Sequence, residues 1–158
     1  MSKQNLLDFI DSYEFTEMAK KIWEHPQVAY EETYACDLQI NRLEKEGFRI
    51  QSSIAGISTA FVAEYGAGKP IIGILGEYDA LPGLSQKVGV AHEPIVSHGA
   101  GHGCGHNLLG TAGVEAVIGL KKRMDEEKLE GTIRYYGCPA EGFRKKLPLL
   151  RAGEQIEE

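Results

Sequence analysis

The segment that decides the fold is IIGILGEYDALPG, from Ile71 to Gly83. It opens with a continuous apolar run after Pro70, which predicts a strand buried on both faces. Two acids, Glu77 and Asp79, follow this run directly. Ligands of open α/β sheets bind beyond the carboxyl ends of the strands, so the segment predicts a sheet with a polar site at its edge. Simple turn chemistry is the competing interpretation, because Asp and Pro are common turn residues.

The hydrophobic pattern on either side of this strand predicts an α/β layer architecture. Apolar residues recur at helical spacing in residues 4–24, 31–46 and 104–128. Strand-forming residues fill 48–53, 59–65 and 131–136. Between them, residues 78–103 are rich in Gly, Pro, Ser and His and have no period. A loop of that length in a compact domain is usually functional or disordered.

The bulk properties exclude several classes of protein. A chain of 158 residues is long enough for one domain with a core, and its net charge of −6 argues against a nucleic-acid binder. Neither a membrane-length apolar run nor a secretory signal is found. The three cysteines, Cys36, Cys104 and Cys138, are too scattered for a disulfide framework. We therefore expect a protein of the reducing cytoplasm, without nucleic-acid or membrane partners.

A second polar segment, GAGHGCGHN, runs from Gly99 to Asn107 and carries His102, Cys104 and His106 among glycines. Thiolate and imidazole are ligands of Zn²⁺ and similar metals, and glycines let such ligands converge. In an extended segment, residues two apart point to the same side, which would bring Cys104 and His106 together. This spacing favours a metal site, and the alternative is a glycine-rich turn with incidental histidines.

A third polar segment, YYGCPAEG, places Glu141 shortly after the last predicted strand. A carboxylate there could act as a general base on a metal-bound water. Taken alone, the segment is better explained by an exposed glutamate after a strand. Cys138 and Cys36 are interpreted as small buried apolar residues.

The order of these motifs, HP, GEYDALPG, GHGCGHN, a helix and then GTIRYYGCPAE, resembles one family. It is similar to the metallo-amidohydrolases and metallopeptidases that include aminoacylases and hippurate hydrolases, and most of all to the aminobenzoyl-glutamate utilisation hydrolases. The resemblance covers residues 1–141. It implies the N-terminal part of a zinc-peptidase-like catalytic domain, a mixed sheet flanked by helices without the family's lid or dimerisation domain.

The resemblance also implies a reaction, the metal-dependent hydrolysis of the amide bond of N-acyl or N-aroyl amino acids or short peptides. Cys104 and His106 would bind one or two divalent ions, Zn or Mn, with His102 as a further candidate ligand. Asp79 would support the site from behind. Glu141 would be the general base that takes a proton from the attacking water.

The chain departs from the family at Gly142, where the family has a glutamate that binds metal. From there, residues 142–158 no longer resemble it. We therefore expect an incomplete catalytic domain over 1–141 and a divergent tail over 142–158, as in a truncated protein with little or no activity alone. The alternative is a non-catalytic fragment that binds partners or oligomerises through an exposed sheet edge. A redox role for Cys104 and Cys138 is disfavoured, because neither lies in a C-x-x-C motif.

Overall fold

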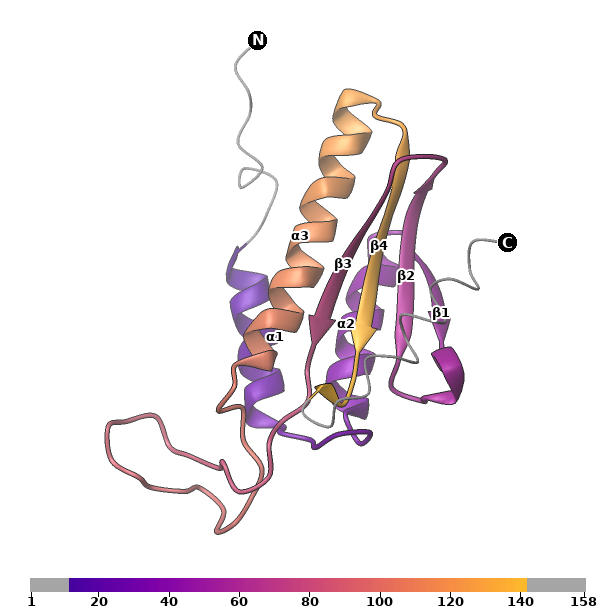
Figure 1. Ribbon diagram of the computed structural model, residues 1–158. Helices are drawn as coiled ribbons and strands as arrows, with labels where there is room; N and C mark the ends of the chain where they lie inside the picture. The colour runs from indigo at the N-terminus through magenta and orange to yellow at the C-terminus, as the bar shows by residue number, and fades with distance from the viewer. Residues whose placement is uncertain (1–11, 142–158) are drawn as a thin grey trace.

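The computed structural model describes residues 12–141 (Figure 1). Two predicted segments lie outside the described residues. They are residues 4–11 of the first predicted helix and the predicted divergent tail 142–158, which begins with Gly142. The described elements, in chain order, are α1 (Ser12–Glu24), α2 (Thr33–Lys45), β1 (Arg49–Ser52), the 3₁₀ turn η2 (Ile54–Gly56), β2 (Phe61–Ala67), β3 (Ile71–Glu77), α3 (His106–Glu127) and β4 (Gly131–Cys138). These match the predicted elements to within a few residues, except η2, which the sequence pattern did not predict.

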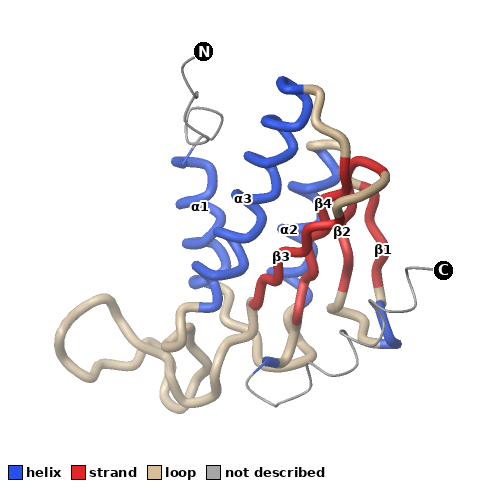
Figure 2. The backbone as a smooth tube through the Cα atoms, turned by 45° about the horizontal axis from the view of Figure 1, so that its top comes forward, coloured by secondary structure: helices blue, strands red, loops and turns tan. Residues whose placement is uncertain are grey.

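The four strands form one mixed sheet in the order β1-β2-β4-β3. β2 runs antiparallel to both β1 and β4, whereas β3 runs parallel to β4. The parallel pair requires a crossover, which α3 provides between β3 and β4. The predicted fold class, a mixed sheet flanked by helices, is therefore confirmed (Figure 2).

The three helices pack on one face of the sheet (Figures 1 and 2). Alternate residues of each strand point into this layer. The buried cluster between helices and sheet contains Phe15, Met18 and Ile22 of α1, Ala35, Cys36 and Leu43 of α2, Phe61 and Ala63 of β2, Val114, Val117 and Ile118 of α3, and Ile133 and Tyr135 of β4. This layer fixes the ends of β3, β4 and α3 relative to one another.

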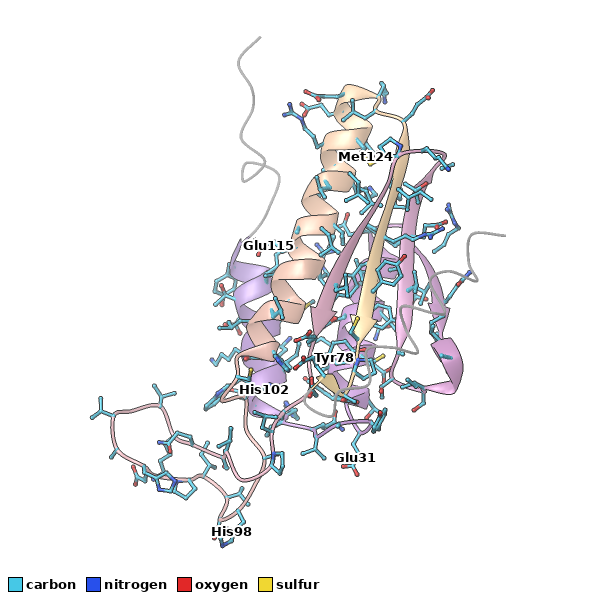
Figure 3. All side chains as sticks on the ribbon, in the orientation of Figure 1. Glu31, Tyr78, His98, His102, Glu115 and Met124 are labelled. Atoms are coloured by element: carbon cyan, nitrogen blue, oxygen red, sulfur yellow. The ribbon has the colours of Figure 1, made fainter. Side chains whose placement is uncertain are left out.

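The long segment between β3 and α3 forms a loop that projects from the body, with His98 far from the sheet (Figure 3). Its two ends are tied together, because Leu81 and Gly101 exchange backbone hydrogen bonds of 3.0 Å in both directions. The Ser85 amide also donates to the Gly99 carbonyl at 2.9 Å. The chain thus returns to the end of β3 immediately before His102.

Among residues 12–141, no helix is long and apolar enough to cross a membrane.

Candidate metal centre

Three elements meet at the carboxyl ends of β3 and β4. Glu77 is the last residue of β3 and pairs in register with Cys138, the last residue of β4. Glu141 follows shortly after β4, and His106 is the first residue of α3. Glu77, His106 and Glu141 each offer one possible ligand atom, and these three atoms lie within 4.8 Å of one another. This is the sheet edge at which the sequence predicted a polar site.

His106 is the centre of this group, and its ring is oriented from both sides. Its Nδ1 lies 2.9 Å from Asp79 Oδ1 and 3.2 Å from the Asp79 carbonyl oxygen. Its Nε2 lies 3.2 Å from Glu77 Oε2 and 3.9 Å from Glu141 Oε2. A carboxylate that accepts the Nδ1 proton leaves the Nε2 lone pair free to bind a metal. The buried Asp79 thus contacts the ring nitrogen that faces away from Glu77 and Glu141, and the supporting role that the resemblance implies for it stays a prediction.

The close approach of α3 to β3 places His106 at the strand end. A Cβ on Gly110 would lie 2.5 Å from the Glu77 carbonyl oxygen, so only glycine allows this contact. The buried Tyr135 hydroxyl lies against the same turn of helix. It donates its one proton to Gln39 Oε1 at 2.6 Å, and its oxygen lies 3.1 Å from the Gly110 carbonyl oxygen, the alternative acceptor. The first turns of α3 are thus fixed against β3 and β4.

Tyr78 anchors the segment that carries both Glu77 and Asp79. Its side chain is buried at the end of the sheet (Figure 3), and its hydroxyl donates to the Thr59 carbonyl. Burial raises the pKa of Tyr78 well above its ordinary value, so the phenol remains a neutral donor. The two acids beside it therefore leave β3 in fixed directions.

His102 is buried next to the centre without joining it. Neither of its ring nitrogens has a hydrogen-bond partner with good geometry in the described part of the chain. Burial lowers the pKa of His102, although the Ile22 carbonyl and the Asp79 charge oppose this effect. Nearby His106 lowers it further. His102 is therefore a neutral imidazole beside the Asp79–His106 pair.

Cys104 is exposed and is not a member of the ligand group found among residues 12–141. The sequence predicted an extended segment that brings Cys104 and His106 to one side. Instead residues 103–104 form a turn, and Gly105 at φ +85° leads into α3. His106 is consequently buried while Cys104 faces outward, and the ligand role of Cys104 stays a prediction. Cys36 and Cys138 are buried, as predicted.

The donors of this group fit a divalent cation. Imidazole nitrogen and carboxylate oxygen are ligands of zinc and manganese alike, and the Asp79 contact to the far ring nitrogen is the usual support for a metal-binding histidine. The sequence indicated Glu77 only as one of two acids of a polar site, on the signal of an apolar strand running into acids. Its direct place beside His106 depends on how closely α3 approaches β3, which no local pattern reveals.

Known proteins are similar to this chain in sequence and in fold. No family model matches the chain. It is 45% identical to a p-aminobenzoyl-glutamate hydrolase subunit from Escherichia coli, over 90% of this chain and 30% of the relative. It is 31% identical to mouse Xaa-Arg dipeptidase, over 86% of this chain and 31% of the relative. A dinuclear metal-binding peptidase of the M20 family from Bacillus subtilis superposes with a TM-score of 0.75 and 27% identity, over 89% of this chain and 39% of that structure.

In sequence and in fold, the chain resembles the metallo-amidohydrolases and metallopeptidases, a group that includes the aminobenzoyl-glutamate hydrolase and the M20 peptidase to which it is similar. The predicted resemblance is thereby confirmed. The chain spans about 30% of the length of the curated relatives it matches.

Proposed function

We propose that residues 12–141 supply part of a metal-dependent centre that hydrolyses the amide bond of N-acyl or N-aroyl amino acids or short peptides. One observation carries the proposal. The Nδ1 atom of His106 is held by Asp79 while its Nε2 faces Glu77 and Glu141 at the sheet edge. The names of similar proteins, a p-aminobenzoyl-glutamate hydrolase and a dipeptidase, support the type of bond.

Each residue has a proposed role. His106 Nε2 and Glu77 hold a divalent ion, Zn or Mn, and Asp79 keeps the imidazole in the binding tautomer. Cys104 and His102 are further candidate ligands from the same glycine-rich segment. A divalent ion bound there supplies Lewis-acid polarisation of the scissile carbonyl and acidifies the attacking water.

Glu141 is the proposed general base. Its side chain is 34% exposed, compared with 6% for His106, so it is the member of the group most open to water and substrate. Glu141 Oε2 takes the proton of the attacking water and delivers it to the leaving amine. The resemblance implies the same role.

We further propose that this centre is incomplete within the chain. With Glu141 as base, the described group offers two ligands, Glu77 and His106, whereas catalytic zinc sites have three protein ligands. The further candidates Cys104 and His102 lie outside this group, and Cys104 faces outward. Gly142 has no side chain to add. This proposal includes the division of the chain into an incomplete catalytic domain, 1–141, and a divergent tail, 142–158. It also includes a location in the reducing cytoplasm, which the free cysteines support. Weak metal binding and little turnover are expected.

Metal titration of the purified chain tests the proposal. Equilibrium dialysis against Zn²⁺ or Co²⁺, with elemental analysis, should detect bound metal in the wild type and lose it in His106→Ala. The control is His92→Ala, which removes an exposed histidine of the projecting loop and should leave binding unchanged. Equal loss in both variants, or binding that survives His106→Ala, would contradict the proposed centre. Rapid hydrolysis of an N-acyl amino acid by the chain alone would contradict its incompleteness.

The exposed edge of β3 favours a second candidate function, a module that self-associates without catalysis. β3 ends the strand order, and Ile72 and Leu75 on it are 51% and 45% exposed. Open strand edges with apolar side chains favour pairing with another chain. Size-exclusion chromatography with metal analysis separates the two functions. A metal-free oligomer supports the second, and a monomer that retains metal supports the first.

A further inference from the structure

A buried acid outside the metal group connects the segments that form it. Glu32, at the start of α2, is 0% exposed, and its side chain does not cap its own helix. Its Oε1 accepts a hydrogen bond from the Ala140 amide at 2.9 Å, across 108 residues of sequence. Its Oε2 accepts one from Thr59 Oγ1 at 3.0 Å. One carboxylate thus joins the start of α2, the segment just before β2 and the segment just after β4.

The surroundings of Glu32 are built for a carboxylate. Burial raises its pKa above the ordinary value, and the amides of Glu32, Ala140 and Tyr30 and the Thr59 hydroxyl oppose that rise. A buried acid is costly unless its oxygens accept hydrogen bonds, and here both do. A hydrophobic side chain could fill the same space without the cost of burying a carboxylate. The presence of the acid and of its two hydrogen bonds therefore needs an explanation.

The amide that Glu32 holds belongs to a strained residue next to Glu141. Ala140 has φ +58°, a conformation that residues other than glycine seldom adopt. Such a conformation persists only where surrounding contacts fix it. Because Glu141 follows directly, the Ala140 conformation sets the direction in which the Glu141 side chain leaves the chain, toward His106 Nε2 at 3.9 Å.

The other acids of the site connect to the same point. The Thr59 hydroxyl donates to Glu32, and the Thr59 carbonyl accepts from the Tyr78 hydroxyl. Tyr78 lies between Glu77 and Asp79 in the chain. The contacts of Thr59 and Glu32 therefore extend from the end of β3 to the end of β4.

We propose that Glu32 is a positioning residue, which sets Glu141 against His106 by holding the Ala140 amide in its left-handed conformation. What Glu141 does there rests on the proposed function. The positioning itself requires no metal and is tested without one.

The first experiment is NMR spectroscopy of the metal-free 158-residue chain. In the wild type the Ala140 amide should exchange slowly, and Glu141 side-chain protons should show Overhauser contacts to the His106 ring. Glu32→Ala should speed Ala140 exchange by at least about tenfold, a loss near 1.4 kcal/mol of protection, and abolish those contacts. Glu32→Gln keeps an oxygen for the Ala140 amide and should restore both signals.

Two control variants separate positioning from general damage. Glu31→Ala removes the neighbouring acid, which is exposed and points away from the body (Figure 3), and should change neither signal. Thr59→Val removes the other hydrogen bond on the same carboxylate and should keep the Glu141–His106 contacts. Should Glu32→Ala fail to fold, Glu32→Asp, which withdraws the carboxylate by one methylene, gives the same comparison. Fast Ala140 exchange in the wild type, or Glu141–His106 contacts that survive loss of the Glu32 carboxylate, overturns the proposal.

Zn²⁺ affinity provides a second readout that distinguishes this proposal from the metal centre. Glu32 positions Glu141, the proposed base, and not the proposed ligands Glu77 and His106, so Glu32→Ala and Glu32→Gln should both keep the Zn²⁺ affinity of the wild type. A wild type that binds no Zn²⁺ while the NMR signals behave as expected refutes the metal centre and leaves the positioning supported. A loss of Zn²⁺ affinity in Glu32→Ala as large as that in His106→Ala shows damage to the whole centre and refutes a role confined to Glu141.

Discussion

The two faces of the sheet are built on different principles. On the face covered by helices, Phe61, Ile133 and Tyr135 are almost completely buried among apolar neighbours. On the opposite face, Glu64 of β2 bridges two guanidinium groups, those of Arg49 and Arg134, each at 2.7 Å. The first face depends on packing, and the second on charge pairing along the strands.

The helical face is the source of most of the stability, whereas the opposite face is the one open to other molecules. Apolar burial on the helical face supplies most of the free energy of folding. The opposite face leaves an apolar side chain open to solvent. Leu75, which pairs in register with Tyr136 of β4, is 45% exposed. Substitutions of the same severity should therefore have unequal effects on the two faces.

The largest effect is expected from Tyr135→Ala on the helical face. Tyr135 is 0% exposed, packs with Phe61 at a ring distance of 5.6 Å and lies against α3 at Gly110. The cavity should lower the free energy of unfolding by about 3–5 kcal/mol, a large part of the stability of a small domain. Urea unfolding followed by circular dichroism measures it. Tyr135→Phe, which removes only the hydroxyl, should cost about 1–2 kcal/mol; an equal loss in both would show that packing contributes little.

An intermediate effect is expected from Glu64→Gln on the opposite face. The substitution leaves the buried Arg134 without its carboxylate and should cost about 1–3 kcal/mol at neutral pH. The matched control is Glu93→Gln, which breaks the exposed pair with Lys87 and should change stability by no more than about 0.5 kcal/mol.

The pH dependence of the Glu64 effect gives a further check. Burial alone would raise the pKa of Glu64, but the hydrogen bonds and charges of Arg49 and Arg134 outweigh it, so the pKa lies below its ordinary value of 4.5. The contribution of the carboxylate is therefore present above pH 4.5 and is lost as the pH falls through the lowered pKa. The difference between wild type and Glu64→Gln should shrink at acid pH; a difference that grows there would contradict the pairing.

The smallest effect on stability is expected from Leu75→Thr at the outer strand. The side chain is already half exposed, so the free energy of unfolding should change by no more than about 0.5 kcal/mol. Any self-association through β3 should weaken, as measured by sedimentation velocity. Val90→Thr makes a comparable change on the projecting loop and should leave association unchanged. Equal association in wild type and Leu75→Thr would exclude this part of the β3 edge from the contact.

The sequence predicted most of the fold, because each element carries its own local pattern. The apolar run from Ile71, the helical spacing after His106 and the strand before Cys138 all matched. It also indicated His106, Asp79 and Glu141 through motif and resemblance, and the structure brings these three together.

What the sequence could not indicate depends on tertiary contacts. Glu31 and Glu32 look alike in the chain, yet Glu31 is exposed and Glu32 is bonded to Ala140 on a distant strand end. The turn at Gly105 that separates Cys104 from His106 likewise depends on where α3 meets the sheet. Neither feature has a periodic signature that a single sequence could show.

The paired hydrogen bonds between Leu81 and Gly101 have a consequence for how this architecture tolerates change. They close the projecting loop at its base, and residues 86–93 at its tip form their hydrogen bonds with one another beyond this closure. Doubling the length of a flexible loop costs only about 0.6 kcal/mol. The loop is thus a place where insertions, tags or alternative sequences can be accepted while His102 and His106 keep their positions, and its surface can diversify separately from the chemistry at its base.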